Sequence, residues 1–479
     1  MKKVIALCLM LALMLSLFGC AGETGSETTV PTTEPEEAAV LQVGYARADI
    51  TPTAAVPMAG YGNGTSRLSE TVLDPLYLTC IAFRQGEDTF LLVSLDLLQS
   101  FEAVFAATKL RMVRKTGVPA DRILFCCTHT HSAPQLSATD SNTELYVEAF
   151  QKAALTAAEQ AIADLAPATL LGTKTQVENM NFVRHYLMND GSYYGPNFGS
   201  TESGYKSHLR ESDKELLLVK AARGEGKADI LLMNWQAHPC LSSTLNRYCV
   251  SADYIGEVRT WVEEHTGAHF AFFQGAAGNH NIRSKIKGEC PTMNPVEYAA
   301  LLGERALVAL ENTVPLKGGK VKSEERTVTV EIDHTEDSML ESAKIVSAFW
   351  KRTNDRKATD AMAKPYGIHS PYHAGAIIAR RSMPATKEMT VYAVSVGELG
   401  FACAPYEMFC DNGQFIKENS PFPGTFLVTC CNATNAYLAS KLAFDYGCYE
   451  KDNRRFVRGT AELIADHFVS MLKQLKEEN

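Results

Sequence analysis

The sequence lacks an excess of positive charge, any Cys-x-x-Cys motif and any long apolar run beyond its first twenty residues. Its 479 residues include 46 Lys and Arg against 55 Asp and Glu, so a nucleic-acid surface has no electrostatic support. Thirteen cysteines are too few for a disulfide scaffold of this length, and no Cys-x-x-Cys pair suggests a structural zinc. With 46% hydrophobic and 21% charged residues, the composition excludes a disordered or collagen-like chain.

The N-terminus has the features of an export signal. Two lysines precede an apolar run from Val4 to Phe18, which is shorter than the roughly twenty residues of a membrane-spanning helix. The run ends in Leu17-Phe18-Gly19-Cys20, which resembles the bacterial lipobox and implies cleavage before Cys20 and lipidation of its thiol. We therefore expect residues 1–20 to be a lipoprotein signal peptide and the protein to be anchored at the extracytoplasmic face of the cell membrane. The alternatives are an ordinary secretion signal and an uncleaved anchor.

Residues 21–41 are predicted to be a disordered tether, because the segment is rich in Thr, Pro, Gly and Ser and contains five Glu but no Lys or Arg.

Eleven cysteines follow Cys20, an odd number that cannot pair completely within one chain. Several lie in apolar runs, which is typical of buried free thiols.

Residues 42–479 alternate short apolar runs with helical patterns, without an internal repeat or a linker. This predicts one large α/β domain of mixed β-sheets flanked by helices. Strands are expected at 89–95, 122–127, 216–221, 230–235, 270–274, 320–332, 392–396, 400–404 and 426–431. Helices are expected at 101–116, 144–165, 255–265, 294–312 and 456–475.

Residues with side chains suited to catalysis follow several of these strands. They are His129 and His131, His238, Glu407, the segment 432–437 that ends in Tyr437, and the Gly- and Ala-rich segment 275–281. Five such strand ends suggest one shared crevice with a metal site at the strand ends. Imidazole and carboxylate ligands with an open position for water point to zinc.

Each signal taken alone also has a structural interpretation. If the segment after residue 127 is extended, His129 and His131 point the same way, yet an isolated His-x-His pair is also compatible with two surface histidines. A single histidine such as His238 is more often a structural residue. Glu407 has an alternative role in stabilising the N-terminus of a following helix.

The order and spacing of these motifs resemble the N-terminal catalytic domain of the neutral/alkaline (non-lysosomal) ceramidase family, from about Val43 to Glu450. Asp49-Ile50-Thr51, Met58-Ala59-Gly60-Tyr61, Thr128-His129-Thr130-His131-Ser132-x-Pro134 and Asn234-Trp235-x-x-His238 carry the resemblance.

The resemblance implies a zinc amidohydrolase that cleaves the N-acyl bond of ceramide or a related N-acyl lipid by zinc-activated water. It places the ligands of one catalytic Zn²⁺ at His129, His238, Glu407 and Tyr437. It assigns proton transfer to His131, and oxyanion stabilisation or substrate orientation to Arg184 and Tyr449. Neither a second, structural divalent ion nor the oligomeric state follows from the sequence.

The sequence departs from the family pattern at three places. Asn281 stands where the family's Gly-Asp-x-Ser-Pro turn has its serine, which favours attack by zinc-activated water or else a loss of activity. Ala133-Pro134-Gln135-Leu136 replaces Gly-Pro-Gly-Gly, so the pocket rim is expected to differ. The third expected difference is that the family's C-terminal immunoglobulin-like domain is absent. The open alternatives are a zinc hydrolase for another amide or ester, such as an N-acyl amino compound or a cell-wall fragment, and a catalytically dead surface binding protein.

Overall fold

The computed structural model describes residues 40–61, 67–196, 202–224, 226–289 and 293–478. The expected signal peptide, the lipidation site Cys20, nearly all of the expected tether and Cys290 lie outside these ranges. Within them, no helix has the length and apolar character required to cross a lipid bilayer.

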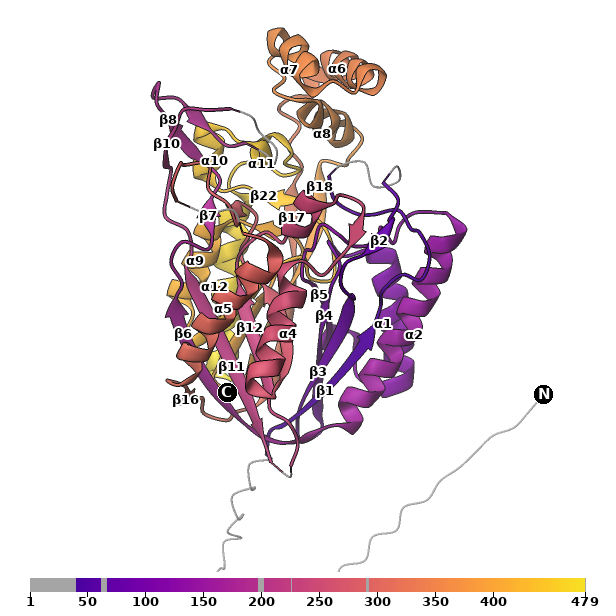
Figure 1. Cartoon of the computed structure of the whole chain (residues 1–479), viewed down its shortest axis with the longest axis vertical. Coiled ribbons are helices and arrows are strands. Elements are labelled where there is room, and N and C mark those ends of the chain that lie inside the picture. Colours follow the sequence, from indigo (N-terminus) through magenta and orange to yellow (C-terminus); the bar gives the residue numbers. More distant parts are fainter. Residues whose placement is uncertain (1–39, 62–66, 197–201, 225, 290–292, 479) are drawn as a thin grey trace, which may run out of the picture. The chain divides into compact units, whose positions relative to one another are not determined.

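A nine-stranded mixed sheet organises the folded unit (Figure 1). In order across the sheet, its strands are β14 (His269–Gln274), β12 (Ile230–Trp235), β11 (Glu215–Arg223), β6 (Ala166–Gln176), β1 (Gln42–Asp49), β3 (Tyr77–Gln85), β4 (Asp88–Leu95) and β5 (Ile123–Cys127), with β16 (Val314–Pro315) also on β6. Only the two outermost pairs, β4–β5 and β12–β14, are parallel. Along the ladder β5 runs opposite to β12 and β14, but β1 and β6 join the two halves of the sheet only through the pairs Gln42–Pro167 and Val43–Ala166. The carboxyl ends of β5 and β12 nevertheless lie close together, because His129 and His238, which follow them, are in contact.

One face of this sheet is covered by helices. They are α1 (Glu102–Thr116) and α2 (Ser141–Ala163) over the β1–β5 half, and α4 (Tyr254–Thr266) and α5 (Pro295–Leu310) over the other half. Alternate strand residues such as Leu91 and Val93 point into the first helical layer, because side chains in a strand alternate between its two faces.

The opposite face packs on a second, four-stranded sheet. Its order is β17 (Val321–Glu331), β18 (Thr386–Val396), β19 (Leu399–Cys403) and β21 (Gly424–Val428). Phe401 and Phe426 of this sheet contact Phe83 and Phe273 of the large sheet, with ring centroids 6.5 and 5.9 Å apart. Helices α9 (Cys410–Asn419) and α12 (Thr460–Glu477) cover its outer face. The four layers confirm the predicted α/β class with mixed sheets flanked by helices.

A small helical cluster lies beyond the strand ends (Figure 1). It contains α6 (Leu340–Thr353), α7 (Arg356–Ala363) and α8 (Pro371–Arg381), around a separate apolar core that includes Val346 and Ile377. The remaining short elements are β2 (Thr71–Val72), β7 (Phe182–Val183), β8 (Tyr186–Met188), β9 (Tyr193–Tyr194), β10 (Tyr205–His208), α3 (Leu241–Leu245), β13 (Cys249–Val250), β15 (His280–Asn281), β20 (Glu407–Met408), β22 (Tyr437–Leu438), α10 (Lys441–Tyr446) and α11 (Tyr449–Asp452).

Several boundaries differ from the sequence prediction; for example, the strand expected to begin at residue 392 begins at Thr386, and two further differences have a clear cause. The C-terminal helix begins at Thr460 rather than at residue 456, because Phe456 forms a bridge with Ile332 and Gly459 adopts a left-handed conformation with φ 98°. The predicted strand 426–431 ends at Val428, because Cys430 has φ 54° and cannot continue an extended strand.

The described cysteines are free and buried, as the sequence predicts: Cys80, Cys126, Cys127, Cys240, Cys249, Cys403, Cys410, Cys430, Cys431 and Cys448. The Sγ atoms of Cys126 and Cys431 lie 3.8 Å apart. At that separation the pair is in van der Waals contact and not in a disulfide, which requires about 2.05 Å.

Candidate metal centre

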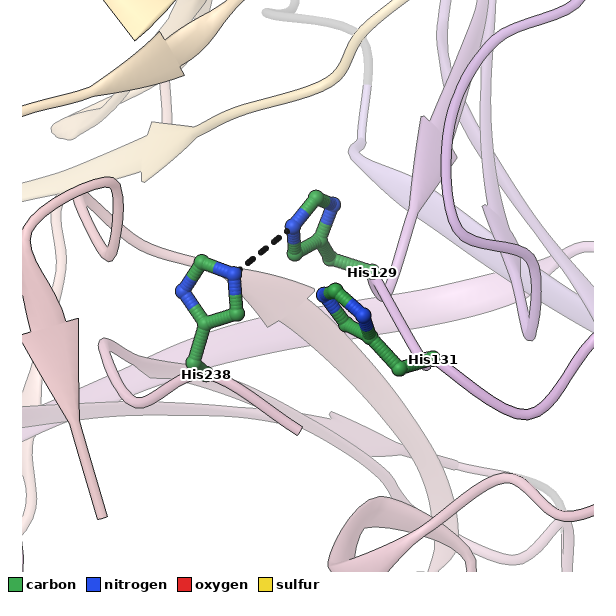
Figure 2. A group of neighbouring side chains, drawn as sticks. All are labelled: His129, His131 and His238. Atoms are coloured by element: carbon green, nitrogen blue, oxygen red, sulfur yellow. Dashed lines mark hydrogen bonds between the residues drawn. The ribbon is translucent and has the colours of Figure 1, made fainter. Parts of the chain in front are cut away.

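Three imidazoles converge beyond the carboxyl ends of β5 and β12 (Figure 2). His129 and His131 follow β5, and His238 follows β12. The ring centroids of His129 and His238 lie 4.7 Å apart, and that of His131 lies 5.2 Å from each of them. All three side chains are buried, so these are not the surface histidines of the alternative interpretation.

The backbone orients two of these rings toward one point. The Nδ1 of His129 lies 2.7 Å from the carbonyl oxygen of Leu98, and the Nδ1 of His238 lies 3.0 Å from that of Ala277. A carbonyl only accepts hydrogen bonds, so each Nδ1 carries a proton, which leaves Nε2 as the atom of each ring that can bind a metal. The two Nε2 atoms lie 3.1 Å apart. This is the arrangement in which backbone carbonyls fix the tautomer of metal-binding histidines.

Glu407 completes the group from the segment that follows the second sheet. It follows β19 and opens β20, which pairs in parallel with β22, so that Glu407 lies opposite Tyr437. The Oε2 of Glu407 is 3.2 Å from the Nε2 of His129 and 3.6 Å from the Nε2 of His238. It is also buried without a hydrogen-bond donor among the described residues, and a buried carboxylate oxygen without a donor is costly unless a cation compensates it.

These separations fit one tetrahedral zinc ion. Ligand bonds of about 2.0–2.2 Å place neighbouring ligand atoms roughly 3.3–3.6 Å apart, and the three distances among His129, His238 and Glu407 are 3.1, 3.2 and 3.6 Å. The residues that would hold the ion are thus His129, His238 and Glu407, with Tyr437 beside Glu407. The described side chains are compatible with a divalent cation.

The protonation of the three histidines depends on their burial and on the charged groups around them. Burial, together with His129 and Arg184, lowers the pKa of His238 far below its usual range, so its ring is neutral, the form that binds metals. Burial also lowers the pKa of His131, with His129, Arg67 and Arg184 acting in the same direction. His129 differs: although burial opposes the charge, the Glu407 carboxylate raises its pKa.

Burial and the neighbouring carboxylate of Glu407 raise the pKa of Tyr437. The neutral phenol is therefore the favoured form next to an isolated carboxylate. A cation held by Glu407 would reverse this balance, because a nearby positive charge favours the phenolate.

The conformation of the His-x-His segment differs from the sequence prediction. We expected an extended segment whose two histidines share a face, but His129 has φ 72°, in the left-handed region. The reason is local, since the N–H of His129 bonds to the carbonyl of Leu97 at 2.9 Å while that of His131 bonds to Pro239 at 3.1 Å. The two rings approach each other nearly edge to face, so they converge through a turn.

Arg184 is fixed by a buried ion pair. Its Nε donates to the Oε1 of Glu450 at 2.6 Å, and its Nη2 donates to the carbonyl of Gly278 at 3.0 Å. The other oxygen of Glu450 lies 3.0 Å from the Nε2 of His185, whose Nδ1 is 2.7 Å from the hydroxyl of Tyr446. The sequence predicts a role for Arg184, whereas no local pattern indicates His185.

The remaining two predicted residues lie around Arg184. Tyr449 opens α11, and its ring centroid is 6.1 Å from that of Tyr437. Asn281 belongs to β15, is half-buried, and its Oδ1 accepts a hydrogen bond from the backbone of Arg283 at 3.3 Å. Asn281 lines a cavity together with Arg184.

The segment 275–281 organises the centre without supplying a ligand. Its carbonyl groups accept from His238 and from Arg184, and the side chain of Asn279 accepts from the backbone N–H of Cys410 at 2.9 Å. Gly278 packs directly against the Glu407 strand: a Cβ placed on it would lie 2.9 Å from the carbonyl oxygens of Glu407 and Met408. The sequence shows a Gly- and Ala-rich turn here, but the approach to residue 407 is visible only in three dimensions.

Gly278→Ala is expected to weaken zinc binding by about 10- to 100-fold, because the added methyl group must push the Glu407 backbone away from the two histidines. Zinc affinity is measured by competition with a chromogenic chelator. Gly375→Ala is the matched control, since that glycine lies within α8 with open space around it, and it should leave zinc affinity unchanged. Equal zinc affinities for the Gly278 variant and the wild type would contradict the positioning role.

The Glu450 pair predicts a pH dependence of stability. Burial raises the pKa of this carboxyl, but Arg184 and His185 outweigh it and hold the pKa at about 2, below the ordinary 4.5. A lowered pKa stabilises the fold above pH 4.5 by roughly 3 kcal/mol, and this contribution is lost as the pH falls toward 2.

The measurement is the difference in unfolding free energy between the wild type and Glu450→Gln, from urea denaturation at pH 6 and pH 3. We expect the difference to fall by roughly half over this interval. Glu304→Gln, at an exposed position on α5, should show a small difference at both pH values. A Glu450 difference that does not depend on pH would refute the assignment.

Comparison with known proteins identifies a family model and solved structures that are similar to this chain. The family model described as neutral/alkaline non-lysosomal ceramidase, N-terminal, matches residues 41–282, slightly more than half of the chain. No curated protein matches the sequence. Among solved structures, the chain is similar to the neutral ceramidase from Pseudomonas aeruginosa, with a TM-score of 0.69 and 18% identity over 92% of this chain and 75% of that chain. It is also similar to a ceramidase complexed with C2, with a TM-score of 0.67 and 17% identity over 92% and 76% of the two chains. At these identities the likeness shows a shared fold.

Proposed function

The chain belongs to the neutral/alkaline non-lysosomal ceramidase family, and on this premise we propose that it is a zinc-dependent amidohydrolase that cleaves the N-acyl bond of ceramide or a related N-acyl lipid. The products are a free fatty acid and an amine such as sphingosine. The observation that carries the proposal is the triangle of ligand atoms from His129, His238 and Glu407, with sides of 3.1, 3.2 and 3.6 Å. A structural role for these residues would not require three potential ligand atoms to face one another in a buried site.

Zinc bound there would act as a Lewis acid toward the amide carbonyl and lower the pKa of water. The chain's own residues supply the rest. His131, whose ring lies 5.2 Å from those of His129 and His238, is placed to transfer protons at the centre. Arg184 presents a permanent positive charge beside the centre and is held in place by Glu450 and Gly278, so it needs little reorganisation to stabilise a developing oxyanion. Tyr449 and Tyr437 add hydroxyl groups on the α11 side.

Asn281 would not act as a nucleophile, since an amide side chain lacks a hydroxyl group. This favours attack by activated water over attack by a side chain. The position of Asn281 beside Arg184 suits contact with the substrate.

Metal analysis and a substrate assay test the proposal. The purified protein should contain about one zinc per chain and release fatty acid from ceramide in mixed micelles. Protein that binds no zinc after dialysis against zinc-containing buffer would overturn it. Zinc-loaded protein inactive on ceramide and on a panel of N-acyl amides would favour a binding protein instead.

We also propose membrane anchoring through Cys20, which brings the enzyme to the surface where N-acyl lipids reside. The expected result is incorporation of a labelled fatty acid that is lost in Cys20→Ser. Equal labelling of both proteins would contradict it.

A further inference from the structure

A cavity of about 280 Å³ lies next to the metal centre. We call it the Arg283 cavity. Its walls include Arg184, Cys240, Thr244, Asn281, Arg283 and Lys285. Arg184 belongs both to this wall and to the surroundings of His131 and His238, whose pKa values it lowers. Cys240 follows His238 by two residues. The cavity is therefore adjacent to the place where the scissile amide would be activated.

The described residues lining the Arg283 cavity carry three cationic side chains and no carboxylate. Arg184 is already compensated by Glu450. Arg283 is not: its Nη2 donates to the carbonyl of Met293 at 3.3 Å, while its Nε is buried without an acceptor among the described residues. A buried guanidinium N–H without an acceptor is costly, and an anionic ligand would remove that cost with a charge-assisted hydrogen bond.

The neutral part of the cavity sets the size and shape of the ligand. Thr244 and Asn281 offer hydrogen-bonding groups, and Leu241 and Pro196 offer apolar contact. A volume of about 280 Å³ lies at the lower end of small-molecule sites, which is large enough for a compact anionic group but too small for a long acyl chain. A planar carboxylate matches the guanidinium fork of Arg283.

We propose that the Arg283 cavity binds a carboxylate on the amine side of the substrate, so that the preferred substrates are N-acyl amino acids rather than neutral N-acyl amines. This rests on the proposed amidohydrolase function. Hydrolysis breaks the bond between the carbonyl carbon and the nitrogen, transfers the hydroxyl of water to that carbon and delivers the proton to the nitrogen. The products are a fatty acid and a free amino acid, which Arg283 holds during the reaction.

The test compares substrates with the same acyl chain on the zinc-loaded protein. These are N-lauroylglycine, its neutral amide N-lauroylglycinamide, and N-lauroylphosphoethanolamine, with ceramide in mixed micelles alongside. The kcat/KM for N-lauroylglycine should exceed that for the neutral amide by about tenfold or more. In Arg283→Met this ratio should fall about tenfold, whereas in Arg305→Met, a matched change at an exposed position of α5, it should not change.

A binding measurement separates recognition from turnover. N-(dodecylsulfonyl)glycine, which resists hydrolysis, should bind Arg283→Met about tenfold more weakly than the wild type by calorimetry. The carboxylate assignment would be overturned if N-lauroylglycinamide were hydrolysed as well as N-lauroylglycine, or if N-lauroylphosphoethanolamine were preferred tenfold. Either result would leave the proposed amidohydrolase function unaffected. No hydrolysis of any of the four substrates by zinc-loaded protein would overturn both.

Discussion

His238→Ala is expected to remove bound zinc and to reduce amide hydrolysis by about 10³-fold or more. The Nε2 of His238 forms two sides of the ligand triangle, to His129 at 3.1 Å and to Glu407 at 3.6 Å. Without it, only His129 Nε2 and Glu407 Oε2 remain of the triangle, whereas structural or catalytic zinc sites use at least three protein ligands. Loss of a Lewis acid that contributes several kcal/mol corresponds to a rate loss of this order.

His238 is the better choice than His129 for this experiment. His129 has φ 72°, where alanine is strained, so His129→Ala would mix loss of a ligand with a change in backbone stability. The measurements are zinc content by plasma mass spectrometry and fatty-acid release. His265→Ala, at an exposed position in the last turn of α4, is the matched control and should keep both. Wild-type zinc content in His238→Ala would refute its role as a ligand.

Arg184→Ala is expected to lower kcat by about 10²- to 10³-fold while leaving the zinc content close to that of the wild type. Arg184 is buried and preoriented by Glu450 and the carbonyl of Gly278, and its guanidinium cannot serve as a metal ligand because it is permanently cationic. Removing a preoriented charge from an oxyanion site has effects of this size. Because the interaction is expected mainly in the transition state, kcat should fall more than KM rises.

The control must account for stability, because Arg184→Ala leaves Glu450 buried without its main partner, at a cost of about 3–5 kcal/mol. Arg380→Ala serves this purpose. Arg380 is also buried and paired, with Glu336 in the helical cluster, so its loss should destabilise the protein to a similar extent with little change in kcat. Thermal unfolding and kcat are measured for both variants. Loss of zinc from Arg184→Ala in proportion to its loss of activity would contradict the assigned role.

Many of the strands and helices could be predicted from the sequence, because their signals are local. The apolar run before residue 96 and the alternation over residues 320–332 correspond to β4 and β17. The strands β1, β3 and β6 in the middle of the large sheet and the helices α6–α8 were not predicted. Boundary errors occurred where a contact with a distant residue decides the conformation. Phe456 looks helical by its pattern, but its bridge to Ile332 delays the start of α12. The left-handed conformation of His129 depends on the loop around Leu97.

The candidate site also contains residues that the sequence indicates and residues that it does not. The positions of His129, His238 and Glu407 after strands are visible in the sequence, and the family resemblance named Tyr437. The groups that orient these residues are not visible in the sequence. The acceptors for His129 and His238 are the backbone carbonyl groups of Leu98 and Ala277, and His185 belongs to no recognisable pattern. Backbone acceptors carry no sequence signature, since every residue has one.

The sequence by itself determined the α/β class, the free thiols among the described cysteines, and which residue types stand at the strand ends. These depend on composition and on periodicity within about ten residues. Only the tertiary structure decided that ligand atoms from the segments after β5, β12 and β19 meet within 3.6 Å, and that a cationic cavity adjoins them. The physical reason is that the metal geometry is set by distances between segments more than a hundred residues apart, which are fixed by the packing of the two sheets.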